Sequence, residues 1–331
     1  EKTMKAVICN STKLDYEIVT KEIPKPLEGE VLVKVIVAPI HPSDALRPLG
    51  VLGPVSFPIQ MGMEAYGEVI EENINDINKA ESLKGKYVGL WSPKAFTWAE
   101  YTVVPRDELI IAPKYEKKDY GLAANYFLNP LTALGIVNIV KLGNYQSVAY
   151  NAGSSQISKM IIQLFKKEGI KTLPIVRKAE QIKELQDLGA TEVLNSSDPN
   201  FVKDLKSSIA RLGVKVFFES VGGKESTNLL QELDDDSTII TFGRVSGEPY
   251  DDKIIKELKE KRGFIFDGYH LFSYFKKLNS DQLKAVSEKI ANELKTTFKS
   301  DINKFVKLED VSEAFKEYSS NMSKGKMIIE L

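Results

Sequence analysis

The sequence predicts an α/β protein with an irregular β-barrel domain and a doubly wound parallel-sheet domain. Its 331 residues are enough for two domains, each with its own core. Residues 1–122 are rich in strand patterns that proline and glycine interrupt, whereas residues 123–270 alternate strand and helix patterns. Residues 271–331 carry more helix and a last strand, Met327–Leu331, and we expect them to return to the first domain.

Short β-compatible runs predict the first domain. A stretch rich in proline and glycine, Pro39–Pro58, lies among these runs and favours loops over regular structure. The predicted strands are Lys5–Cys9, Val31–Val37, Gly67–Glu71, Tyr87–Leu90 and Tyr101–Val104. Short strands separated by frequent turns are typical of a barrel.

A regular rhythm of strand and helix predicts the second domain. The predicted strands are Ser147–Asn151, Thr172–Val176, Glu192–Leu194, Val214–Phe218 and Ser237–Phe242. The predicted helices are Ile157–Glu168, Gln181–Leu188, Asn200–Leu212, Ser226–Glu232 and Asp251–Lys261. Strands that are joined through helices indicate a parallel sheet with helices on both faces.

The stretch Gln146–Lys159 predicts a dinucleotide-binding turn at the start of the second domain. A buried strand runs through small residues into a helix whose apolar positions follow a helical period, and Gly169 ends that helix. The fingerprint G-x-G-x-x-G reads Gly153-x-Ser155-x-x-Ser158, so serine replaces two glycines. The helix N-terminus can hold a pyrophosphate, although a crossover that binds no ligand also fits this stretch.

The end of the next strand indicates which dinucleotide would bind. An NAD site usually has an acidic residue there, whereas this chain has Arg177 and Lys178. Two cations at the start of the following helix oppose its dipole at about 0.3–1 kcal/mol each, and a 2′-phosphate would offset that cost. We therefore expect NADPH rather than NADH, with two solvated surface cations as the alternative.

Composition excludes several classes of function. The charges of the 45 basic and 46 acidic residues nearly cancel. The sequence has no stripe of basic residues of the kind that would predict nucleic-acid binding. No apolar run approaches the roughly 20 residues that a membrane span needs. The one cysteine, Cys9, excludes an internal disulfide and any multi-cysteine zinc site, and it fits a reducing compartment rather than secretion.

Short landmarks follow one another in a fixed order along nearly the whole chain. They include Met4–Val7, Gly29–Val35, His41–Asp44, Gly62–Val69, Ala99–Tyr101, Asn129–Ala133, Glu219–Gly223, Thr241–Gly243 and Gly325-Lys326. In this order they resemble the medium-chain dehydrogenase/reductases, on the zinc-free side that includes quinone oxidoreductases and enoyl thioester reductases. The resemblance implies a GroES-like barrel, a Rossmann domain and a homodimer joined at a sheet edge around Thr238–Val245. The segment Lys261–Phe266 resembles the family's return from the nucleotide domain.

Three departures from the family pattern bear on the chemistry. Zinc-dependent members have histidine before the glutamate, but Met63 precedes Glu64 here, so we expect no metal. His41 stands where related reductases have asparagine, and a histidine there can donate a proton or serve structure. Leu52, or a neighbour, stands where enoyl thioester reductases have their proton-donating tyrosine, which weighs against that reaction.

The resemblance assigns the candidate site residues. His41 and Tyr66 are the candidate catalytic residues. The candidate cofactor-binding residues are Asn129, Thr132, Gly153, Ser154, Ser155, Gln156, Ile157, Arg177, Lys178, Asn195, Ser196, Phe242, Gly243, Arg244 and Val245. For Phe242 and Val245, a place in the core of the sheet is an equally supported alternative to cofactor binding.

The predicted function is a zinc-independent, NADPH-dependent reductase that transfers hydride to a quinone or an α,β-unsaturated carbonyl. One alternative is a mitochondrial trans-2-enoyl thioester reductase. An alternative of another class is a catalytically silent member that serves as a subunit or scaffold of a larger assembly. Cytoplasm and mitochondrial matrix are the expected compartments.

Overall fold

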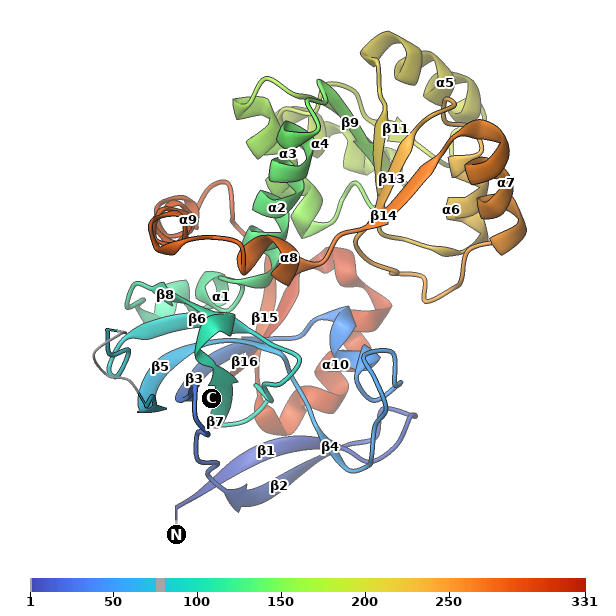
Figure 1. Cartoon of the computed structure of the whole chain (residues 1–331). Helices are drawn as coiled ribbons and strands as arrows, with labels where there is room; N and C mark the ends of the chain where they lie inside the picture. Colours follow the sequence, from blue (N-terminus) through green and yellow to red (C-terminus); the bar gives the residue numbers. More distant parts are fainter. Residues whose placement is uncertain (1, 76–80) are drawn as a thin grey trace. The chain divides into compact units, whose positions relative to one another are not determined.

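A computed structural model describes residues 2–75 and 81–331 of the chain (Figure 1). It divides the chain into two compact units. Unit 1 comprises Glu1–Pro130 and Leu278–Leu331, and unit 2 comprises Leu131–Lys277. The sequence predicted domain borders at residues 122 and 270, whereas the observed borders between the two units follow Pro130 and Lys277.

Unit 1 contains two β-sheets around an apolar core. One sheet has the order β2-β1-β4, formed by Tyr16–Glu22, Thr3–Cys9 and Ile59–Gln60. The larger sheet has the order β15-β16-β3-β5-β6-β8, and β7 also pairs with β3. Its strands are Ile302–Lys307, Lys326–Glu330, Glu30–Pro39, Glu64–Asn73, Tyr87–Trp91 and Leu109–Ala112, with β7 at Tyr101–Pro105. Valines of β3 and β5, Trp98 and residues of α10 (Val311–Ser320) share the core.

Unit 2 contains a six-stranded sheet whose strand pairs are all parallel. The order is β11-β10-β9-β12-β13-β14. These strands are Leu194–Asn195, Lys171–Val176, Ser147–Tyr150, Val216–Glu219, Thr238–Thr241 and Ile265–Gly268. The predicted doubly wound α/β fold is confirmed, and β9 and β12 meet where the strand order reverses.

Helices cover both faces of the unit 2 sheet (Figure 1). On one face, α5, α6 and α7 bury Leu205, Leu230 and Leu258 against the strands. On the other, α3 carries the predicted apolar stripe, with Met160, Ile161, Leu164 and Phe165 all buried. The helices are α3 Gln156–Lys167, α4 Ile182–Leu188, α5 Phe201–Leu212, α6 Gly223–Leu230 and α7 Asp252–Arg262.

The edge strand of unit 2 differs from the predicted one. We expected an edge around Thr238–Val245, but β13 pairs with β12 on one side and with β14 on the other. That expectation is wrong, because Ile265–Gly268 forms one further strand that lacks alternating hydrophobicity. Within the described residues, the sheet ends at β11 and at β14.

The remaining helices complete the fold. They are α1 Tyr120–Ala123, α2 Leu128–Leu142, α8 Leu271–Phe275 and α9 Ser280–Glu293. In the described part of the chain, no single helix is both long and apolar enough to cross a membrane. The segments Lys117–Ala123 and Leu128–Leu142, bent by 44°, pass the length and composition test only as a pair.

Candidate functional site

The turn after β9 needs glycine at its first fingerprint position. The amide of Gly153 donates to the carbonyl oxygen of Ile175 in the neighbouring strand at 2.9 Å. A Cβ at Gly153 would lie 2.8 Å from that same oxygen, closer than real side chains approach. The turn therefore lies tightly against β10, and no larger residue fits there.

The two fingerprint serines take part in the turn. Ser155 caps α3, because its side-chain oxygen accepts from the amide of Ser158 at 3.1 Å. The hydroxyl of Ser158 donates to the carbonyl oxygen of Gly153 at 2.5 Å. Ser158 is buried, whereas Ser155 is exposed at the rim of the turn. Serine thus fixes the turn by hydrogen bonds where glycine would only leave space.

The ends of β10 and β11 bring four predicted residues together. Val176 pairs with Asn195, and the amide of Ser196 donates to the carbonyl oxygen of Val176 at 2.8 Å. Arg177 and Lys178 directly follow the end of β10 and are exposed. Sequence reasoning missed Ser197, whose hydroxyl donates to the carbonyl oxygen of Arg177 at 2.7 Å.

Arg177 has one weak ionic partner. Its Nη2 lies 3.5 Å from Oε2 of Glu225, and both side chains are more than 60% exposed. An exposed pair of this kind contributes about 0–1 kcal/mol, since water competes for both charges. A dianionic phosphate can therefore displace Glu225 at little cost.

A buried carboxylate organises the switch point between β9 and β12. Glu219 is 0% exposed and ends β12. Its Oε1 accepts from Asn151 Nδ2 at 2.6 Å, from Ser226 Oγ at 2.5 Å and from the amides of Val221 and Gly222 at 3.0 Å each. Its Oε2 accepts from the hydroxyl of Tyr250. The sequence used Glu219 only as a landmark, because these partners lie on separate elements.

The residues after β13 lie beside the same carboxylate. The amide of Phe242 donates to the carbonyl oxygen of Glu219 at 3.0 Å, and that of Val245 donates to Ser220 at 2.9 Å. Gly243 is exposed, and Arg244 lies over the ring of Tyr250 at 5.8 Å. Val245 is 56% exposed, so the sheet-core reading does not hold for it, while Phe242 is half-buried and packs edge-on against Phe218.

Asn129 and Thr132 lie three residues apart in the first turns of α2, which puts them on one helix face. Each is 6% exposed. Both therefore offer polar atoms from a largely enclosed surface.

His41 is buried with both ring nitrogens occupied. Nε2 contacts Oε2 of Glu64, and Nδ1 lies 3.0 Å from Nζ of Lys326. The side chain is 4% exposed, so contact with a substrate would require one of these partners to move. The catalytic role expected for His41 stays a prediction, and the geometry favours a positioning role.

Tyr66 also lies inside unit 1. Its hydroxyl donates to the carbonyl oxygen of Pro113 at 2.8 Å and accepts from the amide of Tyr115 at 2.9 Å. Burial raises the pKa of its phenol above the ordinary value, which opposes ionisation at neutral pH. Its catalytic role stays a prediction, and these contacts favour a structural role.

The segment after His41 carries a buried carboxyl group, on Asp44, and a buried guanidinium group, on Arg47. Burial raises the pKa of Asp44 to about 6, although His41, Arg47 and Lys326 oppose that shift. Oδ2 of Asp44 accepts from the amide of His41 at 2.7 Å. The guanidinium of Arg47 donates to four backbone carbonyl groups between 2.7 and 3.2 Å. Farther along, Leu52 is 49% exposed.

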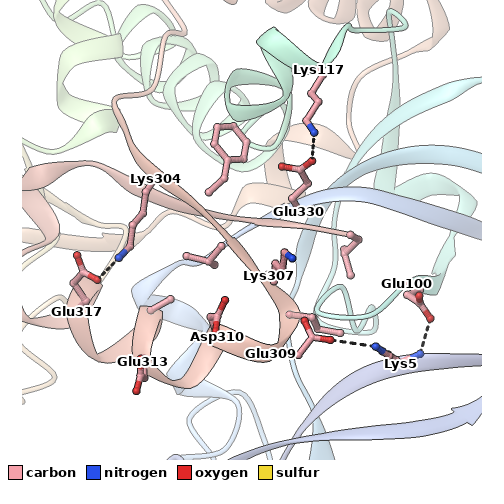
Figure 2. Close-up of a pocket in the computed structure, with 15 residues that line it drawn as sticks. Lys5, Glu100, Lys117, Lys304, Lys307, Glu309, Asp310, Glu313, Glu317 and Glu330 are labelled. Carbon is pink, nitrogen blue, oxygen red and sulfur yellow. Dashed lines mark hydrogen bonds and ion pairs between the residues drawn. The ribbon is translucent and has the colours of Figure 1, made fainter.

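A pocket of about 890 Å³ lies elsewhere in unit 1, and Figure 2 shows it. Three ion pairs join charged side chains of its lining: Lys5 with Glu309, Lys117 with Glu330 and Lys304 with Glu317. None of the predicted site residues lines it. In the residues that the structure describes, no group of three or more His, Cys, Asp and Glu side chains is placed to hold a metal ion.

Comparisons with known proteins agree with this architecture. Residues 188–329 match the family model described as a zinc-binding dehydrogenase. The mitochondrial enoyl-[acyl-carrier-protein] reductase of Arabidopsis thaliana is 34% identical over 232 residues, which cover 67% of this chain and 60% of that protein. The match thus spans less than two thirds of that relative.

Solved structures share the fold over the whole chain. A Mesorhizobium loti protein assigned as an NADPH:quinone reductase gives a TM-score of 0.84 at 24% identity, covering 100% of this chain and 99% of the other. A mutant enoyl thioester reductase from Candida tropicalis gives 0.73 at 22% identity, covering 100% of each chain. The solved structures share the fold, and the family match with the sequence relatives identifies the chain as a member of the medium-chain dehydrogenase/reductase family.

Proposed function

We propose that this protein is an NADPH-dependent reductase that acts on a quinone or an α,β-unsaturated carbonyl without a metal. One observation carries the proposal: the tight turn at Gly153 leads into α3 at the carboxyl end of β9, and Arg177 and Lys178 directly follow the adjacent strand, β10. In doubly wound sheets this is where a dinucleotide binds. The names of the Arabidopsis relative and the Mesorhizobium neighbour are those of reductases, which supports the same reading.

The residues present fit NADPH. Gly153 lets the chain turn close to β10, and the first turn of α3 offers backbone N–H groups to a pyrophosphate. Arg177 and Lys178, with Asn195 and Ser196 beside them, suit the 2′-phosphate. Asn129 and Thr132, with the segment Phe242–Val245, are proposed to line the nicotinamide end.

When bound, NADPH supplies a hydride. The role left to the protein is to orient the reacting carbon or quinone and to exclude water. Neither His41 nor Tyr66 has a free polar atom to donate a proton to a substrate. A reduced quinone can take its protons from water, so this arrangement favours quinone reduction.

Enoyl thioester reduction is the second candidate, because the Arabidopsis relative has that kind of name. A silent scaffold is the third, and the occupied side chains of His41 and Tyr66 are the observation that favours it. Steady NADPH oxidation with a quinone but not with a crotonyl thioester would support the first candidate over the second. Migration of the native protein within a much larger complex would support the scaffold.

Titration with NADPH separates an enzyme from a scaffold before any substrate is chosen. We expect isothermal titration calorimetry to detect a single NADPH site per chain, because the turn, the helix N-terminus and the two cations converge on one place. NADH serves as the control and should bind more weakly. Absence of heat with millimolar NADPH would contradict the proposed function.

We also propose that two copies pair through β14. This strand ends the sheet, and Ile265 on it is 60% exposed. An unpaired strand edge with an exposed apolar side chain is suited to pairing with its own copy about a twofold axis.

Ile265→Arg should convert a dimer into a monomer in sedimentation velocity, because a twofold axis brings two copies of the new charge together. Ile111→Arg is the matched control, since Ile111 is 44% exposed on β8, a strand of unit 1. A wild-type protein that sediments as a monomer, or equal dissociation in both variants, would count against pairing through β14. For the compartment we propose the cytoplasm or the mitochondrial matrix, which cell fractionation can test.

A further inference from the structure

We infer that Lys326 is a positioning residue: through His41 and Glu64 it holds the start of α2, whose first two turns carry Asn129 and Thr132. The link from this turn to the cofactor rests on the proposed function. The chain of contacts from Lys326 to the helix does not, because it lies wholly within unit 1 and the first residues of α2.

The contacts form a continuous buried path. Nζ of Lys326 lies 3.0 Å from Nδ1 of His41 and donates to the hydroxyl oxygen of Tyr318 at 3.1 Å. The other ring nitrogen of His41 contacts Oε2 of Glu64. Lys326 is 6% exposed, His41 3% and Glu64 1%, so water does not screen these interactions.

Only one assignment of donors and acceptors satisfies every contact along this path. An ammonium group can only donate, so Nδ1 of His41 accepts from Lys326. The proton of the neutral ring then sits on Nε2, which donates to the Glu64 carboxylate. An uncharged imidazole with a fixed tautomer therefore joins a buried cation to a buried anion.

Glu64 connects this path to the start of α2. Its other oxygen, Oε1, accepts from the amide of Phe127 at 3.1 Å and from that of Leu128 at 2.9 Å. A carboxylate at this end of a helix also interacts favourably with the helix dipole. Because Asn129 follows Leu128 directly, its placement depends on how Glu64 is oriented, and that orientation depends on Lys326.

Nitrogen-15 NMR of the histidine rings tests the tautomer. The chain has two histidines, so a His270→Gln variant assigns both signals. In the wild-type protein without cofactor we expect His41 to show an unprotonated Nδ1 and a protonated Nε2. A wild-type His41 with a protonated Nδ1 would overturn the inference without any Lys326 variant. In Lys326→Met, whose side chain cannot donate, Nδ1 loses its donor, so we expect its nitrogen-15 signal to shift while Nε2, which faces Glu64, keeps its proton.

Amide hydrogen exchange tests the step to the helix. Loss of a charged hydrogen bond costs about 1.5–3 kcal/mol, so exchange in peptides covering residues 124–134 should speed up about 10-fold or more in Lys326→Met. Thr102→Val is the matched control: Thr102 is 2% exposed in unit 1 and accepts from the amide of Phe96, outside this path. Equal acceleration in both variants would indicate general loosening and would overturn the positioning role.

Binding of NADPH completes the test. We expect Lys326→Met to raise the dissociation constant for NADPH about 10-fold, while Thr102→Val leaves it unchanged. If the Nδ1 signal and the exchange change but binding does not, the link from Lys326 to the cofactor is wrong. If the wild-type protein fails to bind NADPH, the proposed function falls, while the tautomer and the exchange still decide the path from Lys326 to α2.

Discussion

Replacement of Glu219 by leucine is expected to lower the free energy of unfolding of unit 2 by about 3–5 kcal/mol. The substitution leaves buried donors without their acceptor, among them Asn151, Ser226 and Tyr250. The amides of Val221 and Gly222 lose the same oxygen, and each unsatisfied buried group costs about 1–3 kcal/mol. Relief from burying the charge offsets part of that sum.

Urea unfolding followed by circular dichroism measures the effect. Glu225→Leu is the matched control, because Glu225 is 66% exposed and its pair with Arg177 is weak. We expect that control to change stability by about 0.5 kcal/mol or less. Similar losses in both variants would show that the buried network around Glu219 adds nothing of its own.

Replacement of Arg177 by alanine is expected to weaken NADPH binding about 10- to 100-fold and to leave NADH binding unchanged. A hydrogen bond between charged groups contributes about 1.5–3 kcal/mol, which corresponds to that range. NADH lacks the 2′-phosphate, so it should not sense the loss. Isothermal titration with both cofactors measures the two constants in one protein preparation.

Glu225→Gln provides the opposing variant. It removes the carboxylate that lies 3.5 Å from the guanidinium of Arg177, and it removes a negative charge that a phosphate would face. NADPH should therefore bind slightly tighter in this variant. If Arg177→Ala weakened NADH and NADPH equally, the assignment of Arg177 to the 2′-phosphate would be wrong.

Local patterns made unit 2 predictable. The strand, turn and helix around Gly153 follow from residues within one short stretch, and the structure places α3 within one residue of its predicted bounds. The edge at β14 was missed because Ile265–Gly268 carries no alternating pattern, so the sequence did not indicate a strand beyond β13.

Contacts between distant residues made unit 1 less predictable. His41 and Lys326 lie 285 positions apart, and no pattern within the sequence joins them. The sequence identified His41 by its departure from the family, and it could not show that both ring nitrogens are occupied. Tyr66 is similar, because its position in a strand does not reveal that its hydroxyl meets Pro113 and Tyr115.

The position of β16 in the larger sheet bears on how the chain folds as it leaves the ribosome. This strand lies between β3 and β15 in the sheet. β16 is therefore synthesised last, yet it pairs directly with β3, which is synthesised early. Unit 2 is continuous in sequence and can fold while later residues are still being added. Until β16 is made, only Val37–Pro39 of β3 lack that partner, because β5 and β7 can already pair with the rest of the strand, so the barrel closes only after synthesis is nearly complete.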